Sequence, residues 1–145
     1  MRIADILQDK GTNVTTVPVE ATVADAIGLL VELRIGAIPV SDDGTRLEGI
    51  VSERDVVRAV SQGADFATMK VGELMTSTVH TCSPDSTLAE VMTLMIERRI
   101  RHVPVVRDEA LVGILSIRDL VDARLREAEI ERQQMADYIA NRTFN

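Results

Sequence analysis

The chain has 145 residues, of which 46% are hydrophobic and 2% aromatic, and its formal net charge is −7. This length can bury one good core or two small cores that share an interface, and no apolar run approaches the roughly 18 residues that a membrane span needs. The acidic balance argues against broad binding to nucleic-acid phosphates, and the scarcity of aromatic residues argues against a stacking platform for single strands.

The N-terminus and the cysteine content bear on the compartment of the protein. Asp5 and Asp9 interrupt the first residues and no apolar stretch follows Arg2, so we expect no signal peptide. Cys82 is the only cysteine, which excludes an internal disulfide and fits a cytoplasmic location.

The first half of the chain predicts a mixed α/β unit. Apolar residues recur at helical spacing between Thr22 and Ile35, and the short apolar run Ile38-Pro39-Val40 is typical of a strand. The turn signal Asp42-Asp43-Gly44 predicts that the chain reverses and returns in a second strand. In chain order we expect a short helical turn at 3–7, a strand at 14–17, a helix at 22–35, strands at 38–40 and 47–51, and a helix at 52–60.

The same unit recurs in the second half. Pro39 matches Pro104 at an offset of 65 residues, and Asp55 matches Asp119 at an offset of 64, so one residue is lost in the turn between them. Residues 1–7 also match residues 69–75. The second copy therefore predicts the same elements, including helices at 87–99 and from 116 onward. Because a duplicated unit usually packs on its own copy, the seam between the copies is a natural place for a ligand.

The C-terminal tail predicts one long helix that continues the last helix of the second copy. Residues 120–139 contain no Gly or Pro and are rich in Glu, Arg, Ala and Gln. Their apolar stripe is ragged and allows two interpretations. The tail is either a solvated helix that frays near Asn141 or a helix that packs on a partner subunit.

Residues for catalysis are scarce. The chain has two histidines, His80 and His102, and lacks zinc-protease, Cys-x-x-Cys, nucleophile-elbow and Walker-type motifs. A metal site would need about three or four converging ligands, which this supply does not favour. We therefore expect no enzymatic activity, no metal and no catalytic cofactor.

The motif Ser-x-Arg-Asp occurs at residues 52–55 and again at residues 116–119. Ser-x-x-Asp before an apolar helix is a capping box, in which the carboxylate also favours the positive end of the helix. A cap does not need the arginine, so a second interpretation is a site for a ribose phosphate. The carboxylate can accept from both ribose hydroxyls, the free N–H groups and the serine can meet a phosphate, and arginine recognises phosphate with its fork.

The two copies differ just before their Pro-Val strands. The first copy has Gly36 and Ala37 where the second has Arg101 and His102. The two basic residues are either exposed cations near a helix C-terminus or part of an anion site that only one copy possesses. Gly36 and Ala37 would leave room for a flat ring to lie close to the backbone.

These features resemble the cystathionine-β-synthase-type (CBS) domain, here in tandem as a Bateman module. The resemblance rests on Met75-Thr76, the Ile-Pro-Val and Val-Pro-Val strands with their turns, and Gly-Ile-x-Ser-x-Arg-Asp, and it covers residues 1 to about 124. It implies an α/β fold of two pseudo-twofold-related units, each with a three-stranded sheet and two helices. It divides the chain into CBS domain 1 at 1–62, CBS domain 2 at 69–124 and a helical tail at 125–145.

The resemblance also implies a ligand class and its binding residues. Such modules commonly bind AMP, ADP or ATP, and sometimes S-adenosylmethionine or a dinucleotide, in two clefts that mix residues from both copies. The ribose-binding groups would be Asp55 with Ser52 and Arg54, and Asp119 with Ser116 and Arg118. The base-binding wall would be Val14, Thr15, Gly36, Ala37 and Ile38 in one copy, and Thr76, Val79, His80, His102 and Val103 in the other. Arg101 and His102 occupy positions of basic phosphate ligands, so we expect the cleft with Asp119 and Arg101 to be the stronger site.

The sequence thus predicts a regulatory nucleotide-sensing module without catalytic activity. Modules of this kind usually pair into a disc, so we expect a homodimer, a regulated partner protein that this chain does not encode, and no nucleic-acid or membrane partner. One alternative is a constitutive dimerisation scaffold with degenerate ligand sites. The other is an enzyme with a hidden site.

Overall fold

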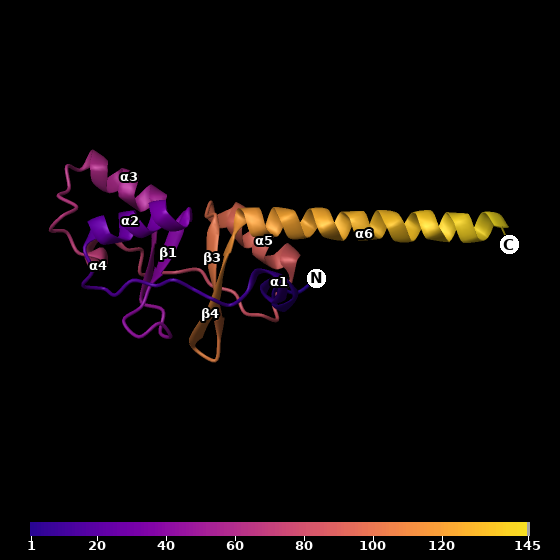
Figure 1. Ribbon diagram of the computed structural model, residues 1–145, viewed down its shortest axis with the longest axis horizontal. Helices are drawn as coiled ribbons and strands as arrows, with labels where there is room; N and C mark the ends of the chain where they lie inside the picture. The colour runs from indigo at the N-terminus through magenta and orange to yellow at the C-terminus, as the bar shows by residue number, and fades with distance from the viewer. Residues whose placement is uncertain (145) are drawn as a thin grey trace.

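Each repeat folds into an antiparallel strand pair flanked by helices, and one long helix leaves the second repeat (Figure 1). The computed structural model describes residues 1–144. The first half contains α1 (Ile3–Lys10), α2 (Val23–Leu33), β1 (Ala37–Val40), β2 (Gly49–Ser52) and α3 (Glu53–Ser61). The second half contains α4 (Val71–Leu74), α5 (Leu88–Arg98), β3 (His102–Arg107), β4 (Ala110–Ser116) and α6 (Ile117–Phe144).

The helices predicted at 22–35 and 87–99 are confirmed, and both copies begin and end them in the same way. Thr22 caps α2 by accepting from the backbone N–H of Asp25 at 3.1 Å, and Thr87 caps α5 by accepting from that of Glu90 at 3.2 Å. Arg34 and Arg99 end these helices in the left-handed conformation, each with φ of 54°. This turn directs the chain back into the following strand.

The three-stranded sheets are not confirmed, because the third strand of each is reduced to a single bridge. β1 pairs with β2 and β3 with β4, while Val17 alone bridges β1 in parallel and Cys82 alone bridges β3. The strand predicted at 14–17 is therefore wrong in length. Only the last of its four residues, Val17, pairs with β1: its N–H donates to the carbonyl of Pro39 at 3.2 Å, and its carbonyl accepts from the N–H of Ser41 at 2.9 Å.

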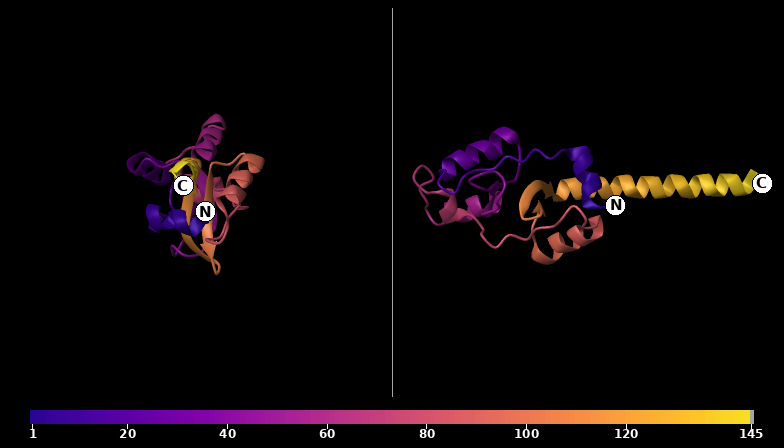
Figure 2. Two further views of the ribbon diagram at one scale, coloured as in Figure 1. Left: turned by 90° about the vertical axis from the view of Figure 1, so that its right-hand side faces the viewer. Right: turned by 90° about the horizontal axis from the view of Figure 1, so that it is seen from below.

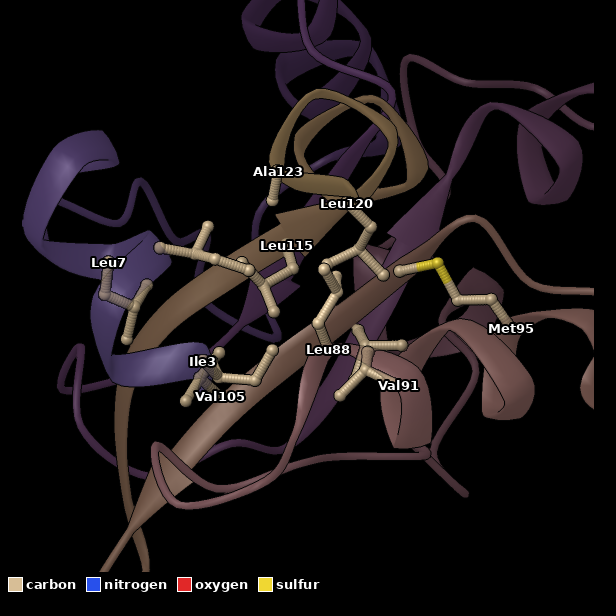
Figure 3. Close-up of a cluster of buried hydrophobic side chains, with 11 residues drawn as sticks. Ile3, Leu7, Leu88, Val91, Met95, Val105, Leu115, Leu120 and Ala123 are labelled. Atoms are coloured by element: carbon tan, nitrogen blue, oxygen red, sulfur yellow. The ribbon is translucent and has the colours of Figure 1, made fainter. Parts of the chain in front are cut away.

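The first helix of each repeat, α1 or α4, packs in the hydrophobic core of the other repeat. Ile3, Ile6 and Leu7 of α1 are buried among residues of the second repeat, with Val91, Leu115 and others of α5, β3, β4 and α6. Figure 3 shows Ile3 and Leu7 pointing into this cluster from a helix that belongs to the first repeat. In the opposite sense, Val71 of α4 is buried in the core of the first repeat. Each packing unit therefore contains one segment from the other copy.

Matching backbone hydrogen bonds fix this exchange. The N–H of Ile3 donates to the carbonyl of Ser86 at 2.9 Å, and the N–H of Val71 donates to the carbonyl of Ala21 at 2.8 Å. Views from two further directions agree that α1 lies against the second unit (Figure 2).

The recurring glycines at the start of the second strands have a packing role. A Cβ on Gly49 would lie 2.6 Å from Sδ of Met75 and 2.9 Å from the carbonyl oxygen of Thr76, and a Cβ on Gly113 would lie 2.8 Å from Cδ2 of Leu7. The ends of the exchanged helices thus approach these strands more closely than any side chain would permit. This explains why glycine occurs at the same place in both copies.

The predicted C-terminal helix is confirmed and is longer than expected. α6 has 28 residues, which corresponds to about 42 Å, and most of it extends away from the rest of the molecule (Figure 1). It does not end near Asn141 but continues to Phe144. Its beginning is tied to α1, because Arg126 donates to the carboxylate of Asp9 at 2.8 Å. No helix among residues 1–144 is long and apolar enough to cross a membrane.

We predict that shortening a leucine on α6 destabilises the protein strongly on the buried face of the helix and hardly at all on the exposed face. Leu120 is 0% exposed and Leu125 is 65% exposed. Leu120→Ala should lower the free energy of unfolding by about 3 kcal/mol, because it leaves a cavity in the second core. Leu125→Ala, the matched control, should change it by no more than about 0.5 kcal/mol. Urea unfolding followed by circular dichroism measures both, and equal losses would contradict the packing described here.

Candidate functional site

Two clefts lie where the repeats meet, and each mixes residues from both. The first has a volume of about 250 Å³ and is built around Asp55. The second has a volume of about 690 Å³ and is built around Asp119. Pockets for small molecules usually have about 300–1,000 Å³. The Asp119 cleft falls within this range, and the Asp55 cleft is slightly smaller.

The capping interpretation of Ser-x-Arg-Asp is confirmed in both copies. The N–H of Ser52 donates to Oδ2 of Asp55 at 2.8 Å, and the N–H of Ser116 donates to Oδ2 of Asp119 at 2.8 Å. The serine hydroxyls donate to the same oxygens at 3.1 and 3.0 Å. Each aspartate is thereby held at the N-terminus of a helix, α3 or α6, where negative charge is favourable.

The carboxylate of Asp55 is fully occupied by this chain. Its Oδ2 accepts from Ser52, and its Oδ1 accepts from the guanidinium of Arg58 and from the hydroxyl of Thr76 at 3.3 Å. The side chain of Asp55 is 5% exposed. A ligand in the first cleft would have to displace Arg58 or Thr76 before it could bind this carboxylate.

The carboxylate of Asp119 has an accessible oxygen. The ammonium of Lys10 lies 2.6 Å from its Oδ2, the same oxygen that caps α6. Within residues 1–144 nothing donates to its Oδ1, and the side chain is 24% exposed. The second cleft therefore presents a free acceptor at a helix N-terminus.

Lys10 links the two repeats at this cleft. It comes from α1 and donates to the carbonyl of Ile114 at 2.5 Å as well as to Asp119. Burial raises the pKa of Asp119, but the hydrogen bonds from Lys10 and from the backbone of Ser116 outweigh that effect and lower it overall. Asp119 is consequently a carboxylate at neutral pH, with its charge balanced by Lys10.

Four residues line both clefts and form the wall between them: Gly36, Glu53, Arg101 and His102. A Cβ on Gly36 would lie 2.8 Å from Cε1 of His102 and 3.0 Å from Oε1 of Glu53. The space predicted above Gly36 for a flat ring is therefore filled by the imidazole of His102. Burial lowers the pKa of His102 and neighbouring Arg101 lowers it further, against the opposing charge of Glu53.

The two motif arginines have different surroundings. Arg54 donates across the seam to the carbonyl of Arg99 at 2.9 Å, the residue that ends α5. Arg118 is exposed and lines the second cleft. Arg54 therefore joins the two copies, while Arg118 faces a cavity.

Most of the predicted site residues lie at the clefts. The first cleft is lined by Ser52, Arg54, Asp55, Thr76, Val79 and His80, and the second by Val14, Thr15, Ala37, Ser116, Arg118 and Asp119. Ile38 and Val103 line neither cleft, because both side chains are fully buried in the cores. Each follows a cleft residue along its strand, so it points to the opposite face of the sheet.

Sequence reasoning missed Lys10, Glu53 and Arg58. Arg58 lies three residues after Asp55 on one helix, and that spacing could have indicated the ion pair. Lys10 is 109 residues from Asp119, and no local pattern connects them. For Glu53 the signal was present, since it stands inside the first Ser-x-Arg-Asp motif where the second has Ile117.

Metal binding and thiol chemistry have no support in the described part of the chain. No group of three or more His, Cys, Asp or Glu residues there could hold a metal ion. Burial raises the pKa of Cys82 to about 11, so its thiol is protonated near neutral pH and is a poor nucleophile.

Comparisons with known proteins agree on one family. The family model described as CBS domain matches residues 3–62 and 71–126. A mitochondrial CBS domain-containing protein of Arabidopsis thaliana is 34% identical in an alignment that covers 94% of this chain and 71% of that protein. Residues 127–144 of α6 lie outside the matched family regions.

Solved structures give the same result. A signal-transduction protein with CBS domains from Burkholderia ambifaria superposes with a TM-score of 0.82 and 39% identity, over 87% of this chain and 95% of that one. A CBS domain pair crystallised with 5′-methylthioadenosine and S-adenosyl-L-methionine superposes with a TM-score of 0.76 and 27% identity, over 85% of this chain and 98% of that one.

We predict that Lys10→Gln raises the pKa of Asp119. The folded-state pKa of Asp119 is lowered, so its contribution to stability is present above the ordinary carboxyl pKa of about 3.9 and is lost as pH falls through the folded value. The variant should be less stable than wild type at pH 7, and the difference should vanish in strong acid. Carboxyl NMR titration measures the pKa of Asp119, and urea unfolding from about pH 2 to about pH 7 measures the difference in stability.

Lys70→Gln is the matched control, because Lys70 is the only other lysine and lies at the start of α4. An unchanged Asp119 pKa in Lys10→Gln would show that the ion pair does not form in solution.

Proposed function

The chain belongs to the CBS domain family, and on that premise we propose that it is a regulatory module that binds adenine nucleotides in clefts between its two repeats. The observation that carries the proposal is the second cleft. It combines a helix N-terminus, the accessible Oδ1 of Asp119 and the basic residues Lys10, Arg101 and Arg118 in one cavity of about 690 Å³. A carboxylate suits ribose hydroxyls, and a helix N-terminus with cations suits phosphate.

The adenosine part of the ligand has support from a relative. The CBS domain pair described above was crystallised with two compounds that both contain adenosine. AMP, ADP and ATP share that moiety and add phosphates, for which the basic residues of the second cleft would provide partners. S-adenosylmethionine and a dinucleotide remain members of the same ligand class for this chain.

The Asp119 cleft is proposed as the stronger site. Its aspartate has a free oxygen, whereas both oxygens of Asp55 already accept hydrogen bonds from Ser52, Arg58 and Thr76. It is also the larger cavity. A nucleotide would fit there without first breaking an ion pair with Arg58.

The module is proposed to act through proteins rather than through catalysis. We propose a homodimer in the cytoplasm, and ligand binding that changes how the repeats meet, which a regulated partner protein would sense. Exposed apolar side chains on the helices support a protein contact; they are Val31, Val57, Val60, Ile96 and Val121.

A constitutive dimerisation scaffold is the second candidate. The observation that favours it is that Arg58 and Thr76 of the chain itself already donate to the carboxylate of Asp55 in the first cleft. If the same held for both clefts in solution, the protein would dimerise but ignore nucleotides.

We predict that Asp119→Asn weakens AMP binding by at least about tenfold, because it removes the charge from the acceptor for the ribose hydroxyls. The asparagine keeps the size of the side chain and can still accept at the cap. Asp108→Asn, in the exposed turn between β3 and β4, is the control and should bind as wild type does. Isothermal titration calorimetry with AMP, ATP and S-adenosylmethionine measures the affinities. No heat and no shift in melting temperature with any of them would refute nucleotide sensing and favour the scaffold.

We predict that Val57→Glu dissociates the homodimer, because Val57 is exposed on α3 and a charge there would have to be buried in the contact. Sedimentation should then give a monomer, while Thr81→Glu, an exposed position before the bridge at Cys82, should leave the dimer intact. A wild-type monomer would contradict the proposed assembly.

A further inference from the structure

The two clefts share one cation. Arg101 lines both, together with His102, Gly36 and Glu53. The other basic residues at the clefts each line only one of them. Arg54 and Arg58 line the first, and Lys10, Arg34 and Arg118 line the second.

The sharing follows from the difference between the repeats. Gly36 and Arg101 hold equivalent backbone positions, since the carbonyl of Gly36 accepts from the N–H of Glu53 at 3.0 Å and that of Arg101 accepts from the N–H of Ile117 at 2.8 Å. Two arginines at this place would give each cleft its own cation. Because the first repeat has glycine at this position, the guanidinium of Arg101 is the only one that lines both clefts.

His102 does not supply a second charge. Its ring packs against Gly36, and burial and Arg101 lower its pKa, so it is mostly neutral near neutral pH. Arg101 is exposed and presents a guanidinium to both clefts. The basic residues of the first cleft are also engaged elsewhere, Arg54 with the carbonyl of Arg99 and Arg58 with Asp55.

We propose that Arg101 is a shared anion-binding residue, so that a nucleotide phosphate bound in one cleft weakens the binding of a nucleotide phosphate in the other cleft. When a nucleotide phosphate in one cleft holds Arg101, the other cleft loses its cation and faces the bound negative charge. That second cleft then prefers an adenosine compound without phosphate. The inference rests on the proposed function and adds a rule for which ligands can occupy the module together.

Single-cleft variants test the sharing. His80→Trp fills the first cleft, because His80 lines only that one, and Asp119→Asn weakens the second cleft; Arg101→Ala is added to each. AMP affinity should fall about tenfold in both backgrounds, as expected for the loss of one charge partner, while adenosine affinity stays unchanged. Arg107→Ala, an exposed arginine at the far end of β3 that lines neither cleft, is the control.

The wild type tests the mutual weakening. Native mass spectrometry should show the second AMP binding about tenfold more weakly than the single-cleft variants predict, and no such deficit for adenosine. Arg101→Ala should abolish the deficit. The proposal is overturned if Arg101→Ala affects AMP in only one background, or if two AMP molecules bind wild type as independently as two adenosine molecules do. Failure of AMP and adenosine to bind at all would instead refute the proposed function.

Discussion

Burial of each repeat's leading helix in the core of the other repeat is the constraint on which the structure depends. Because Ile3 and Leu7 complete the second core and Val71 completes the first, neither unit has a full core of its own. The same exchange brings the chain across the seam twice. It carries Lys10 to Asp119 at one crossing and Thr76 to Asp55 at the other. The clefts therefore exist because the cores are shared, and a ligand that moves one repeat must strain contacts in both.

The Ser-x-Arg-Asp motif shows that a structural and a functional explanation need not compete. In both copies the aspartate caps a helix through one oxygen. The cap uses Oδ2 alone and fixes the carboxylate at the positive end of the helix. Whether Oδ1 accepts a hydrogen bond then depends on the neighbouring side chains. In the first repeat Arg58 and Thr76 occupy it, and in the second it stays open. One local motif thus produces two different sites, and residues outside the motif decide between them.

Much of this fold could be predicted from the sequence, because the information is local. The capping residues Thr22 and Thr87, the turn after Val40 and the periodicity of the helices all act over a few residues. The repeated Ser-x-Arg-Asp motif also predicted a helix cap in each copy, which the structure confirms. What failed was long-range or depended on one neighbour. The exchange of α1 leaves no trace in its own apolar pattern, the third strand of each sheet is reduced to a single bridge, and Lys10 reaches Asp119 across 109 residues of sequence.

The exchange also sets the order in which the chain can fold during synthesis. The first core stays incomplete until Val71 has left the ribosome, although every other residue of that core lies before it. The hydrophobic side of α1 has no partner in the second core until α5 begins to emerge, and that core is completed only when β4 and the start of α6 follow, more than 100 residues after α1. At a synthesis rate on the order of 10 residues per second, about ten seconds pass before the core around Ile3, Ile6 and Leu7 is complete. The nascent chain therefore carries an apolar helix with an incomplete core for most of its elongation, and a second nascent chain on the same messenger offers the identical core for it to enter.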